Sequence, residues 1–242
     1  MARHTALITG GSRGIGLAIA KELASIGYDI FLTSKNEKSL KDAAEQIRKL
    51  SNAKVEYLMC DLSNTKSIEA FHKKFSKKVK SLDVLVNNAG IYEEGTTSNS
   101  SMEKFDKVIN SNLKGMFYLT QKLMHPIEKG SIKRIVIVSS IVALDSYPSK
   151  SGVGGTLYAI SKWALRGWAR TLREETRKKN IGVSIIYPGE VLTDMWEGSN
   201  IPAQRFIQPE DIASVVKTVV STNPQTVVEE VVVRPMHWSY DY

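Results

Sequence analysis

The chain has 242 residues, of which 42% are hydrophobic and 24% charged, a balance that excludes an intrinsically disordered protein. The formal net charge of +8 suits nucleic acid, membrane phosphates or an anionic ligand. No DNA-binding signature or zinc-ligand spacing accompanies the lysine clusters, so we interpret them as solvated helix faces and expect neither nucleic acid nor a metal ion as partner. The single cysteine, Cys60, excludes an intrachain disulfide framework.

The hydropathy of the chain and its first residues predict a location in the cytoplasm. No apolar stretch reaches the roughly 18 residues that a membrane span requires. The first strand-like run begins at residue 5, which leaves no room for a signal peptide. We therefore expect a cytoplasmic protein without a membrane partner.

Short apolar runs alternate with amphipathic helical patterns from one end of the chain to the other. The runs are continuously apolar, as in strands buried on both faces. This alternation predicts one α/β domain over residues 1–242, with a doubly wound, seven-stranded parallel sheet and helices on both faces. The predicted strands are 5–9, 30–33, 55–59, 84–86, 134–138, 183–187 and 227–233, and the predicted helices are 15–26, 37–50, 65–79, 102–128, 157–179 and 209–221.

The first predicted strand runs into a glycine-rich turn that opens a helix. Glycine accepts unusual backbone angles and lets the main chain approach a pyrophosphate, while the helix N-terminus offers N–H groups and a positive dipole end. An ordinary strand–helix turn is the alternative. The context favours nucleotide binding through Gly10, Ser12, Arg13, Gly14, Ile15 and Gly16.

The spacing of this turn, T-G-x-x-x-G-x-G, resembles that of the short-chain dehydrogenase/reductase family. Three further motifs occur in that family's order: Asn87-Asn88-Ala89-Gly90, the Y-x-x-x-K element from Tyr158 to Lys162, and Pro188-Gly189. The resemblance implies a Rossmann-type fold and hydride transfer between a nicotinamide and an alcohol or carbonyl carbon. It also implies cofactor contacts from Asn88, Ala89, Gly90, Tyr158, Lys162, Pro188, Gly189, Val191 and Thr193.

The end of the second predicted strand indicates which dinucleotide is used. An acidic residue there binds a ribose 2′-hydroxyl, whereas a 2′-phosphate needs cations. Ser34 stands where NAD-using relatives carry Asp, Lys35 follows it, and Arg13 lies in the glycine turn. We expect these two cations to converge on one phosphate and therefore predict NADP(H) as the cofactor. The alternative is that both are solvated surface charges. Asp61 and Leu62 resemble the family's adenine contact, although a helix cap or turn is an equal interpretation of Asp61.

Tyr158 and Lys162 lie four residues apart in a helical stretch and so share one face. A nearby ammonium stabilises a phenolate, and we therefore expect Lys162 to lower the pKa of Tyr158 from its usual value near 10. The resemblance assigns Tyr158 as the acid/base and Lys162 as the residue that binds the ribose and tunes the phenol. The family pattern also selects Ser140, rather than Ser139, as the hydroxyl that binds the substrate oxygen.

The fourth catalytic position of the family is an asparagine in an N-L-x-G motif. Asn112 matches it, and Asn110 is the rival. In relatives this asparagine kinks a helix and holds a water beside the lysine.

Two segments depart from the usual family pattern, the one between Ser140 and Tyr158 and the C-terminus, and a third between them matches the substrate lid of relatives. Ser140 and Tyr158 are farther apart than in most relatives, which predicts a lengthened loop at 145–156. Tyr147 on this loop is a candidate substrate contact, with plain packing as an equal alternative. Residues 192–208 are predicted to form a substrate lid, with an ordinary covering loop as the alternative. The aromatic C-terminal tail docks either on a neighbouring subunit or on its own domain. The resemblance implies a homodimer or homotetramer.

The favoured function is an NADP(H)-dependent carbonyl reductase or alcohol dehydrogenase. A non-catalytic NADP-binding regulator is the main alternative, although it has no need for Asn112, Ser140, Tyr158 and Lys162 together. Epimerases and dehydratases of the extended relatives carry a larger C-terminal substrate domain. A 3-hydroxy acid or a small carbonyl compound is the favoured substrate.

Overall fold

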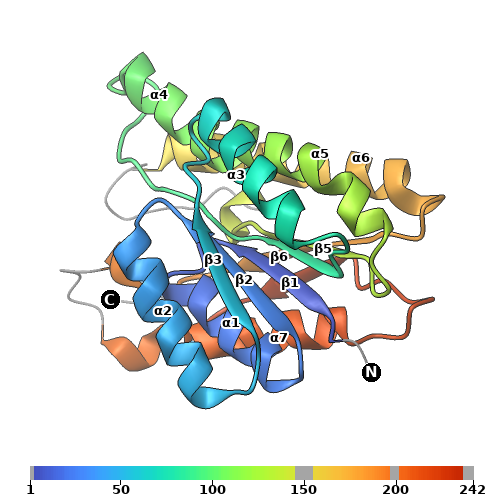
Figure 1. Ribbon diagram of the computed structural model, residues 1–242. Helices are drawn as coiled ribbons and strands as arrows, with labels where there is room; N and C mark the ends of the chain where they lie inside the picture. Colours follow the sequence, from blue (N-terminus) through green and yellow to red (C-terminus); the bar gives the residue numbers. More distant parts are fainter. Residues whose placement is uncertain (1–2, 145–154, 197–201, 237–242) are drawn as a thin grey trace.

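The computed structural model describes residues 3–144, 155–196 and 202–236. In these residues seven strands form one sheet in the order β3-β2-β1-β4-β5-β6-β7 (Figure 1), and every neighbouring pair is parallel. The predicted fold class is confirmed. The strands are β1 Thr5–Thr9, β2 Asp29–Ser34, β3 Val55–Met59, β4 Val84–Asn87, β5 Arg134–Val138, β6 Gly182–Pro188 and β7 Glu230–Val233.

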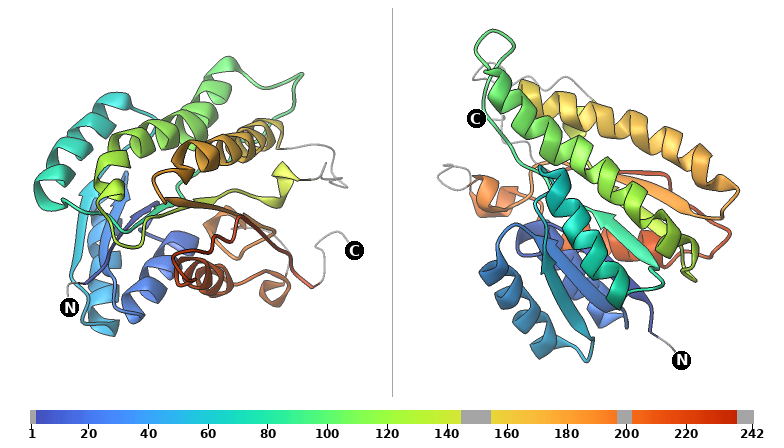
Figure 2. Two further views of the ribbon diagram at one scale, coloured as in Figure 1. Left: turned by 90° about the vertical axis from the view of Figure 1, so that its right-hand side faces the viewer. Right: turned by 45° about the horizontal axis from the view of Figure 1, so that its top comes forward.

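Helices cover both faces of the sheet (Figure 2). One face packs against α1 (Gly14–Ser25), α2 (Glu37–Leu50) and α7 (Pro209–Val220). The other face packs against α3 (Thr65–Lys78), α5 (Gly115–Glu128) and α6 (Thr156–Arg177), with α4 (Met102–Ile109) beside α6. No helix in the described ranges is long and apolar enough to cross a membrane.

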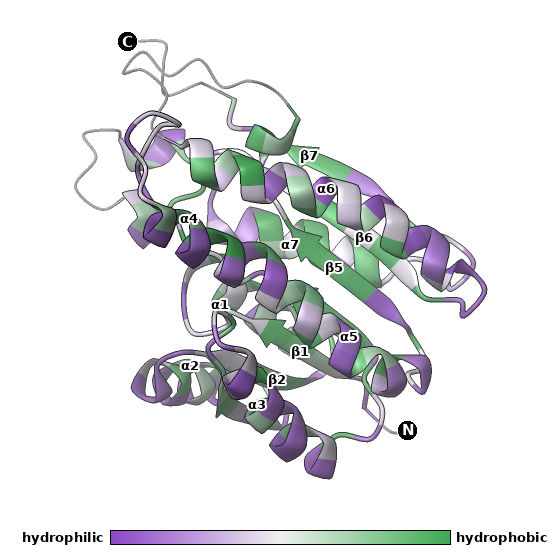
Figure 3. Ribbon diagram, turned by 90° about the horizontal axis from the view of Figure 1, so that it is seen from above, coloured by the Kyte–Doolittle hydropathy of each residue, from purple (hydrophilic) through white to green (hydrophobic). Residues whose placement is uncertain are grey.

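The strand side chains alternate between the two cores. On β1, Ala6 and Ile8 belong to the core under α1, while Leu7 belongs to the core under α5 and α6. Both sets are fully buried, because helices cover both faces. Figure 3 shows hydrophobic strands, and helices that carry many hydrophilic residues. This double burial explains why the strands read as continuous apolar runs in the sequence.

The order of the strands places a crevice beside the end of β1. The chain moves outward from β1 to β3 and then returns to β4 on the other side of β1, so the sheet has its topological switch point there. In open α/β sheets, ligands bind at the carboxyl ends of the strands at this point. The Thr9 hydroxyl accepts hydrogen bonds from the N–H groups of Asn88 (2.9 Å) and Ala89 (3.0 Å) and thereby ties the two strand ends together.

Two predicted elements differ from the structure. The single helix predicted for 102–128 is divided by a π-helix, Asn110–Lys114, between α4 and α5. A π-turn leaves one extra residue in the helix, which local sequence patterns do not reveal. The last strand begins at Glu230 rather than at residue 227.

Candidate active site

The glycine turn after β1 has a backbone conformation that favours glycine. Gly10 and Gly14 have φ values of +63° and +50°. A Cβ on Gly16 would lie 2.2 Å from the Gly10 carbonyl oxygen, so the turn could not pack against α1 with any larger residue. Arg13, the N-cap residue of α1, makes no side-chain hydrogen bond to the first turn. The N–H groups of this helix end, including those of Ile15 and Gly16, are therefore suited to an anionic ligand.

The two cations predicted to meet a 2′-phosphate are each bound to a carboxylate. The Arg13 guanidinium lies 2.6 Å from Asp194, and the Lys35 ammonium lies 3.2 Å from Asp61. In the structure each of the two cations thus has its own acidic partner, and their convergence on one phosphate stays a prediction. All four side chains are at least 38% exposed, so both ion pairs are weak enough for a phosphate to replace them.

Asp61 forms a turn with Ser63, as one of its two interpretations predicted. Its carboxylate accepts hydrogen bonds from the Ser63 N–H (2.9 Å) and hydroxyl (2.7 Å). Partial burial raises the pKa of this carboxyl, but the Ser63 hydrogen bonds and Lys35 outweigh burial and hold it below its usual value. Leu62 is buried under the start of α5.

Asn112 lies in the π-helix and joins three segments. Its side-chain oxygen accepts from the Ile91 N–H (2.8 Å), and its side-chain nitrogen donates to the Ile91 carbonyl (2.9 Å) and to the Ser161 hydroxyl (3.1 Å). The rival Asn110 instead contributes its main-chain carbonyl, which accepts from the Gly115 N–H. The irregular helix expected at this motif is therefore present, with the Asn112 amide at its centre.

Gly115 allows the helix to approach the end of β3. A Cβ at this position would lie 1.9 Å from the Leu62 carbonyl oxygen. We expect Gly115→Ala to lower the free energy of unfolding by about 1–3 kcal/mol, because the backbone must move apart. Gly167→Ala on α6 is the matched control, since an added Cβ there meets nothing within 4 Å. It should be neutral or slightly stabilising. Urea unfolding of the two variants checks this, and equal stabilities would contradict it.

Tyr158, Ser140 and Lys162 gather at the carboxyl ends of β4 and β5. The Tyr158 hydroxyl is hydrogen-bonded to Ser140. The Lys162 ammonium lies 5.3 Å from the centre of the Tyr158 ring and donates to the Val138 carbonyl (3.0 Å). Ser139 instead donates to the Lys162 carbonyl (3.3 Å), so its hydroxyl is used within the protein. The structure thus brings together the three side chains that the motifs select.

Burial controls the acidity of this group. It raises the pKa of Tyr158 to about 12, while the hydrogen bond from Ser140 acts in the opposite direction. It also lowers the pKa of Lys162 to about 8. The expected net lowering of the Tyr158 pKa below its usual value near 10 is therefore wrong, because desolvation of the phenol dominates.

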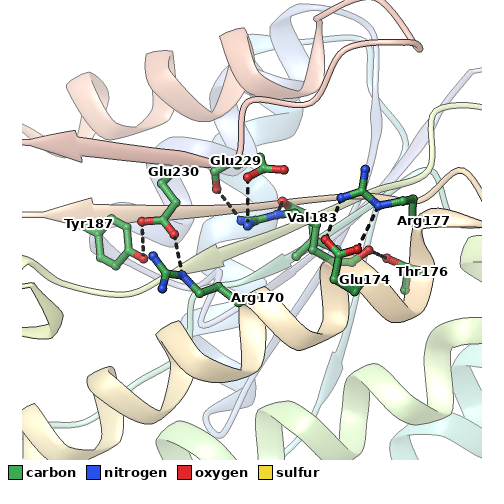
Figure 4. Close-up of polar contacts among 9 residues, drawn as sticks. Arg170, Glu174, Thr176, Arg177, Val183, Tyr187, Glu229 and Glu230 are labelled. Carbon is green, nitrogen blue, oxygen red and sulfur yellow. Dashed lines mark hydrogen bonds and ion pairs between the residues drawn. The ribbon is translucent and has the colours of Figure 1, made fainter.

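Polar contacts attach α6, the helix that carries Tyr158 and Lys162, to the sheet (Figure 4). Glu230 of β7 accepts from the Tyr187 hydroxyl (3.1 Å) and pairs with Arg170 (3.3 Å). Arg173 donates to the carbonyls of Val183 (3.2 Å) and Glu229 (3.1 Å). These contacts hold α6 against β6 and β7.

The segment after β6 lies against the glycine turn. Pro188 ends β6, and the Gly189 N–H donates to the Val233 carbonyl (2.7 Å). Val191 is buried, and a Cβ on Gly14 would lie 3.2 Å from the Thr193 methyl group. The predicted cofactor contacts of this segment are thus adjacent to those of the first turn.

Comparison with known proteins identifies the family. A family model described as short chain dehydrogenase matches residues 4–203. The chain belongs to the short-chain dehydrogenase/reductase family. A 3-oxoacyl-(acyl-carrier-protein) reductase from Chlamydia muridarum is 34% identical over 223 residues, which are 88% of either chain. A sepiapterin reductase from Chlorobaculum tepidum is 32% identical and covers 96% of both chains.

Solved structures agree with this assignment. An alcohol dehydrogenase from Thermococcus sibiricus, in complex with 5-hydroxy-NADP, has a TM-score of 0.87 at 28% identity and covers 99% of both chains. A short chain dehydrogenase from Burkholderia cenocepacia, in complex with NADP, has a TM-score of 0.84 at 29% identity and covers 96% of both chains. These reductases and dehydrogenases bear different substrate names, so membership of the family establishes the reaction class and not the substrate.

One aromatic residue at this site, Tyr92, lies outside the motifs of the family. The Tyr92 ring lies 5.8 Å from the Tyr158 ring, centre to centre, in an edge-to-face arrangement. Its position just after the Asn87–Gly90 motif, at the carboxyl end of β4, is the feature of the sequence that could have pointed to Tyr92 as a site residue. Of the predicted lid, Trp196 and Phe206 are in ring contact at 5.3 Å. Ile201, most of the predicted 145–156 loop with Tyr147, and the aromatic tail lie outside the described residues.

Proposed function

We propose that this enzyme is an NADP(H)-dependent oxidoreductase that interconverts an alcohol and a carbonyl compound, with Tyr158 as the general acid/base. The observation that carries the proposal is the Tyr158–Ser140 hydrogen bond with the Lys162 ammonium 5.3 Å from the centre of the Tyr158 ring. A regulator without catalysis has no need for a phenol, a serine hydroxyl and an ammonium brought together in this way. The test follows NADPH absorbance against a panel of aldehydes, ketones and oxo acids. No turnover across the panel would contradict the proposal.

The residues around the crevice fit a dinucleotide. Gly10 to Gly16 form a turn that larger side chains would fill, and the N-terminus of α1 lacks a side-chain cap. We propose that this turn holds the pyrophosphate, that Ser34, Lys35 and Arg13 hold the 2′-phosphate, and that Asp61 and Leu62 contact the adenine. The remaining contacts come from Asn88, Ala89, Gly90, Pro188, Gly189, Val191 and Thr193. When bound, NADPH supplies the hydride.

Side chains of the protein supply the proton that the substrate oxygen needs. In reduction, the Tyr158 hydroxyl donates its proton to the substrate oxygen as negative charge develops there. The Ser140 hydroxyl donates a hydrogen bond to the same oxygen and stabilises that charge. The Lys162 ammonium, 5.3 Å from the ring centre, stabilises the phenolate that remains. A pKa of about 12 keeps Tyr158 protonated at neutral pH, as a proton donor must be.

We propose that Asn112 is the fourth member of the catalytic group and acts through position. Its side-chain amide is occupied by Ile91 and Ser161, so the side chain aligns the strand end with α6. Ser161 precedes Lys162, and the contact therefore also orients the turn of α6 that bears the lysine.

Lys162 should control the pH dependence of reduction. Its pKa in the folded protein is lowered to about 8, so the ammonium is present below that pH and is lost above it. We expect kcat/KM for NADPH to be level between about pH 6 and 7.5 and to fall up to tenfold per unit above pH 8. Tyr158 stays protonated throughout this range. A profile that stays level to about pH 10 would contradict this role of Lys162.

Two helices, α5 and α6, expose large aromatic side chains. Phe117 on α5 and Trp163 on α6 are 47% and 48% exposed, and large exposed aromatic residues are enriched at interfaces. We propose a homodimer or homotetramer that uses these helices, in the cytoplasm, with 192–208 as a lid over a single Rossmann-type domain. Sedimentation of the purified protein measures the assembly.

A further inference from the structure

We infer that Tyr92 determines substrate specificity: its ring forms the wall on which the substituent of a neutral carbonyl substrate rests while the carbonyl oxygen meets Tyr158. This inference rests on the proposed function and extends it to the class of substrate. Tyr92 is 42% exposed and lies edge-to-face with Tyr158, with 5.8 Å between ring centres.

The backbone around Tyr92 is held on both sides. Asn112 binds both the N–H and the carbonyl of the preceding Ile91. Farther along, Gly95 forms a bridge with Gly155, and the Thr156 N–H donates to the Gly95 carbonyl (3.3 Å). These contacts tie the segment after β4 to the first turn of α6, which carries Tyr158.

The Tyr92 ring packs beside Gly155, the residue before α6. A Cβ at Gly155 would lie 3.4 Å from the edge of the Tyr92 ring, in ordinary contact. The ring therefore lies beside the start of α6 and against the Tyr158 ring, and 42% of Tyr92 is exposed.

A substrate oxygen must reach both Tyr158 and Ser140, which are hydrogen-bonded to each other. The group attached to the carbonyl carbon then extends toward the neighbouring exposed ring. Aromatic rings prefer offset or edge-to-face partners and bury much apolar area. A flat aryl group should gain more from Tyr92 than a short alkyl chain does.

Charge near Tyr92 disfavours an anionic substrate. Glu93 is neutralised by an ion pair with Lys107. Glu94 lies two residues beyond Tyr92 and has no ion-pair partner among the described residues. Burial, and after it the negative charge of Glu94, raises the pKa of the Tyr92 phenol. A substrate carboxylate beside the ring would meet the same charge. Of the two favoured substrates, the neutral carbonyl compound thus fits better than the 3-hydroxy or oxo acid.

The test compares three substrates with NADPH: benzaldehyde, butanal and benzoylformate. For Tyr92→Ala we expect KM for benzaldehyde to rise about tenfold, KM for butanal to change less than about threefold, and kcat to stay within about threefold. Tyr92→Phe keeps the ring and should retain wild-type KM values. Tyr57→Ala removes a half-buried ring from edge strand β3 and should leave the ratio of the two KM values unchanged.

Glu94→Gln tests the charge separately. It should raise kcat/KM for benzoylformate severalfold and leave that for benzaldehyde unchanged. An equal rise of both KM values in Tyr92→Ala, or a loss confined to kcat, would overturn the assignment of Tyr92.

A binding measurement separates this inference from the proposed reaction. Benzamide has the shape of an aryl carbonyl substrate and is not reduced. Calorimetric titration of benzamide into the enzyme with NADP⁺ should show affinity about tenfold weaker for Tyr92→Ala than for wild type or Tyr92→Phe. If no carbonyl is turned over, the proposed function fails, and this titration still decides on Tyr92. Equal affinities, or no binding to any variant, would overturn the role of the ring.

Discussion

Tyr158→Phe is expected to lower kcat for carbonyl reduction by at least about 100-fold, because the substrate oxygen loses its proton donor. The ring, its packing and the neighbouring Lys162 remain, so affinity for NADPH should stay within about twofold of wild type. Steady-state kinetics and fluorescence titration of NADPH measure the two effects. Activity above about one tenth of wild type would exceed what loss of a proton-transfer group allows.

The two serines provide the matched controls for this experiment. Ser140 is hydrogen-bonded to the Tyr158 hydroxyl, whereas Ser139 donates to the Lys162 carbonyl. We expect Ser140→Ala to lower kcat by about 10- to 100-fold, as removal of a donor to a developing oxyanion does. Ser139→Ala should stay within about threefold of wild type. The reverse order would transfer the role to Ser139.

Removal of both Arg13 and Lys35 should abolish the preference for NADP(H). Hydrogen bonds to charged groups contribute about 1.5–3 kcal/mol each. Both side chains are exposed, which weakens such contacts, so we expect each residue to contribute about tenfold to the affinity for NADPH. The double variant Arg13→Ala/Lys35→Ala should therefore lose about 100-fold in kcat/KM with NADPH and little with NADH. Turnover of wild type with both cofactors at matched concentrations measures the preference. Equal or better turnover with NADH would contradict it.

A substitution of Asp194 is a control that should change the affinity for NADPH in the opposite direction. It holds the Arg13 guanidinium at 2.6 Å in the free protein, and a 2′-phosphate must displace it. We expect Asp194→Asn to tighten NADPH binding by a few-fold and to leave NADH binding unchanged, because an exposed ion pair contributes up to about 1 kcal/mol. Weaker binding of both cofactors would show that Asp194 acts on the fold of the turn rather than on Arg13.

The agreement between predicted and observed elements has a local cause. Strands buried on both faces need continuous apolar runs, and helix starts need capping side chains. Asn36, Asn64 and Ser101 cap α2, α3 and α4 with their own side-chain oxygens, so these starts are encoded within a few residues. The glycine turn is local in the same way, since the positive φ values of Gly10 and Gly14 favour glycine over residues with a side chain.

The sequence alone determined the α/β alternation, the family and the choice of Tyr158, Lys162 and Ser140, because each depends on short motifs and burial periodicity. Tertiary structure decided what depends on partners distant along the chain. The Arg13 partner lies 181 residues away, and the π-helix at Asn112 forms where Gly115 packs under Leu62. The Tyr158 pKa is raised because folding removes water from the phenol, and the Tyr92 ring meets Tyr158 because Asn112 binds the segment that carries it. Such contacts depend on three-dimensional proximity, which local sequence patterns do not contain.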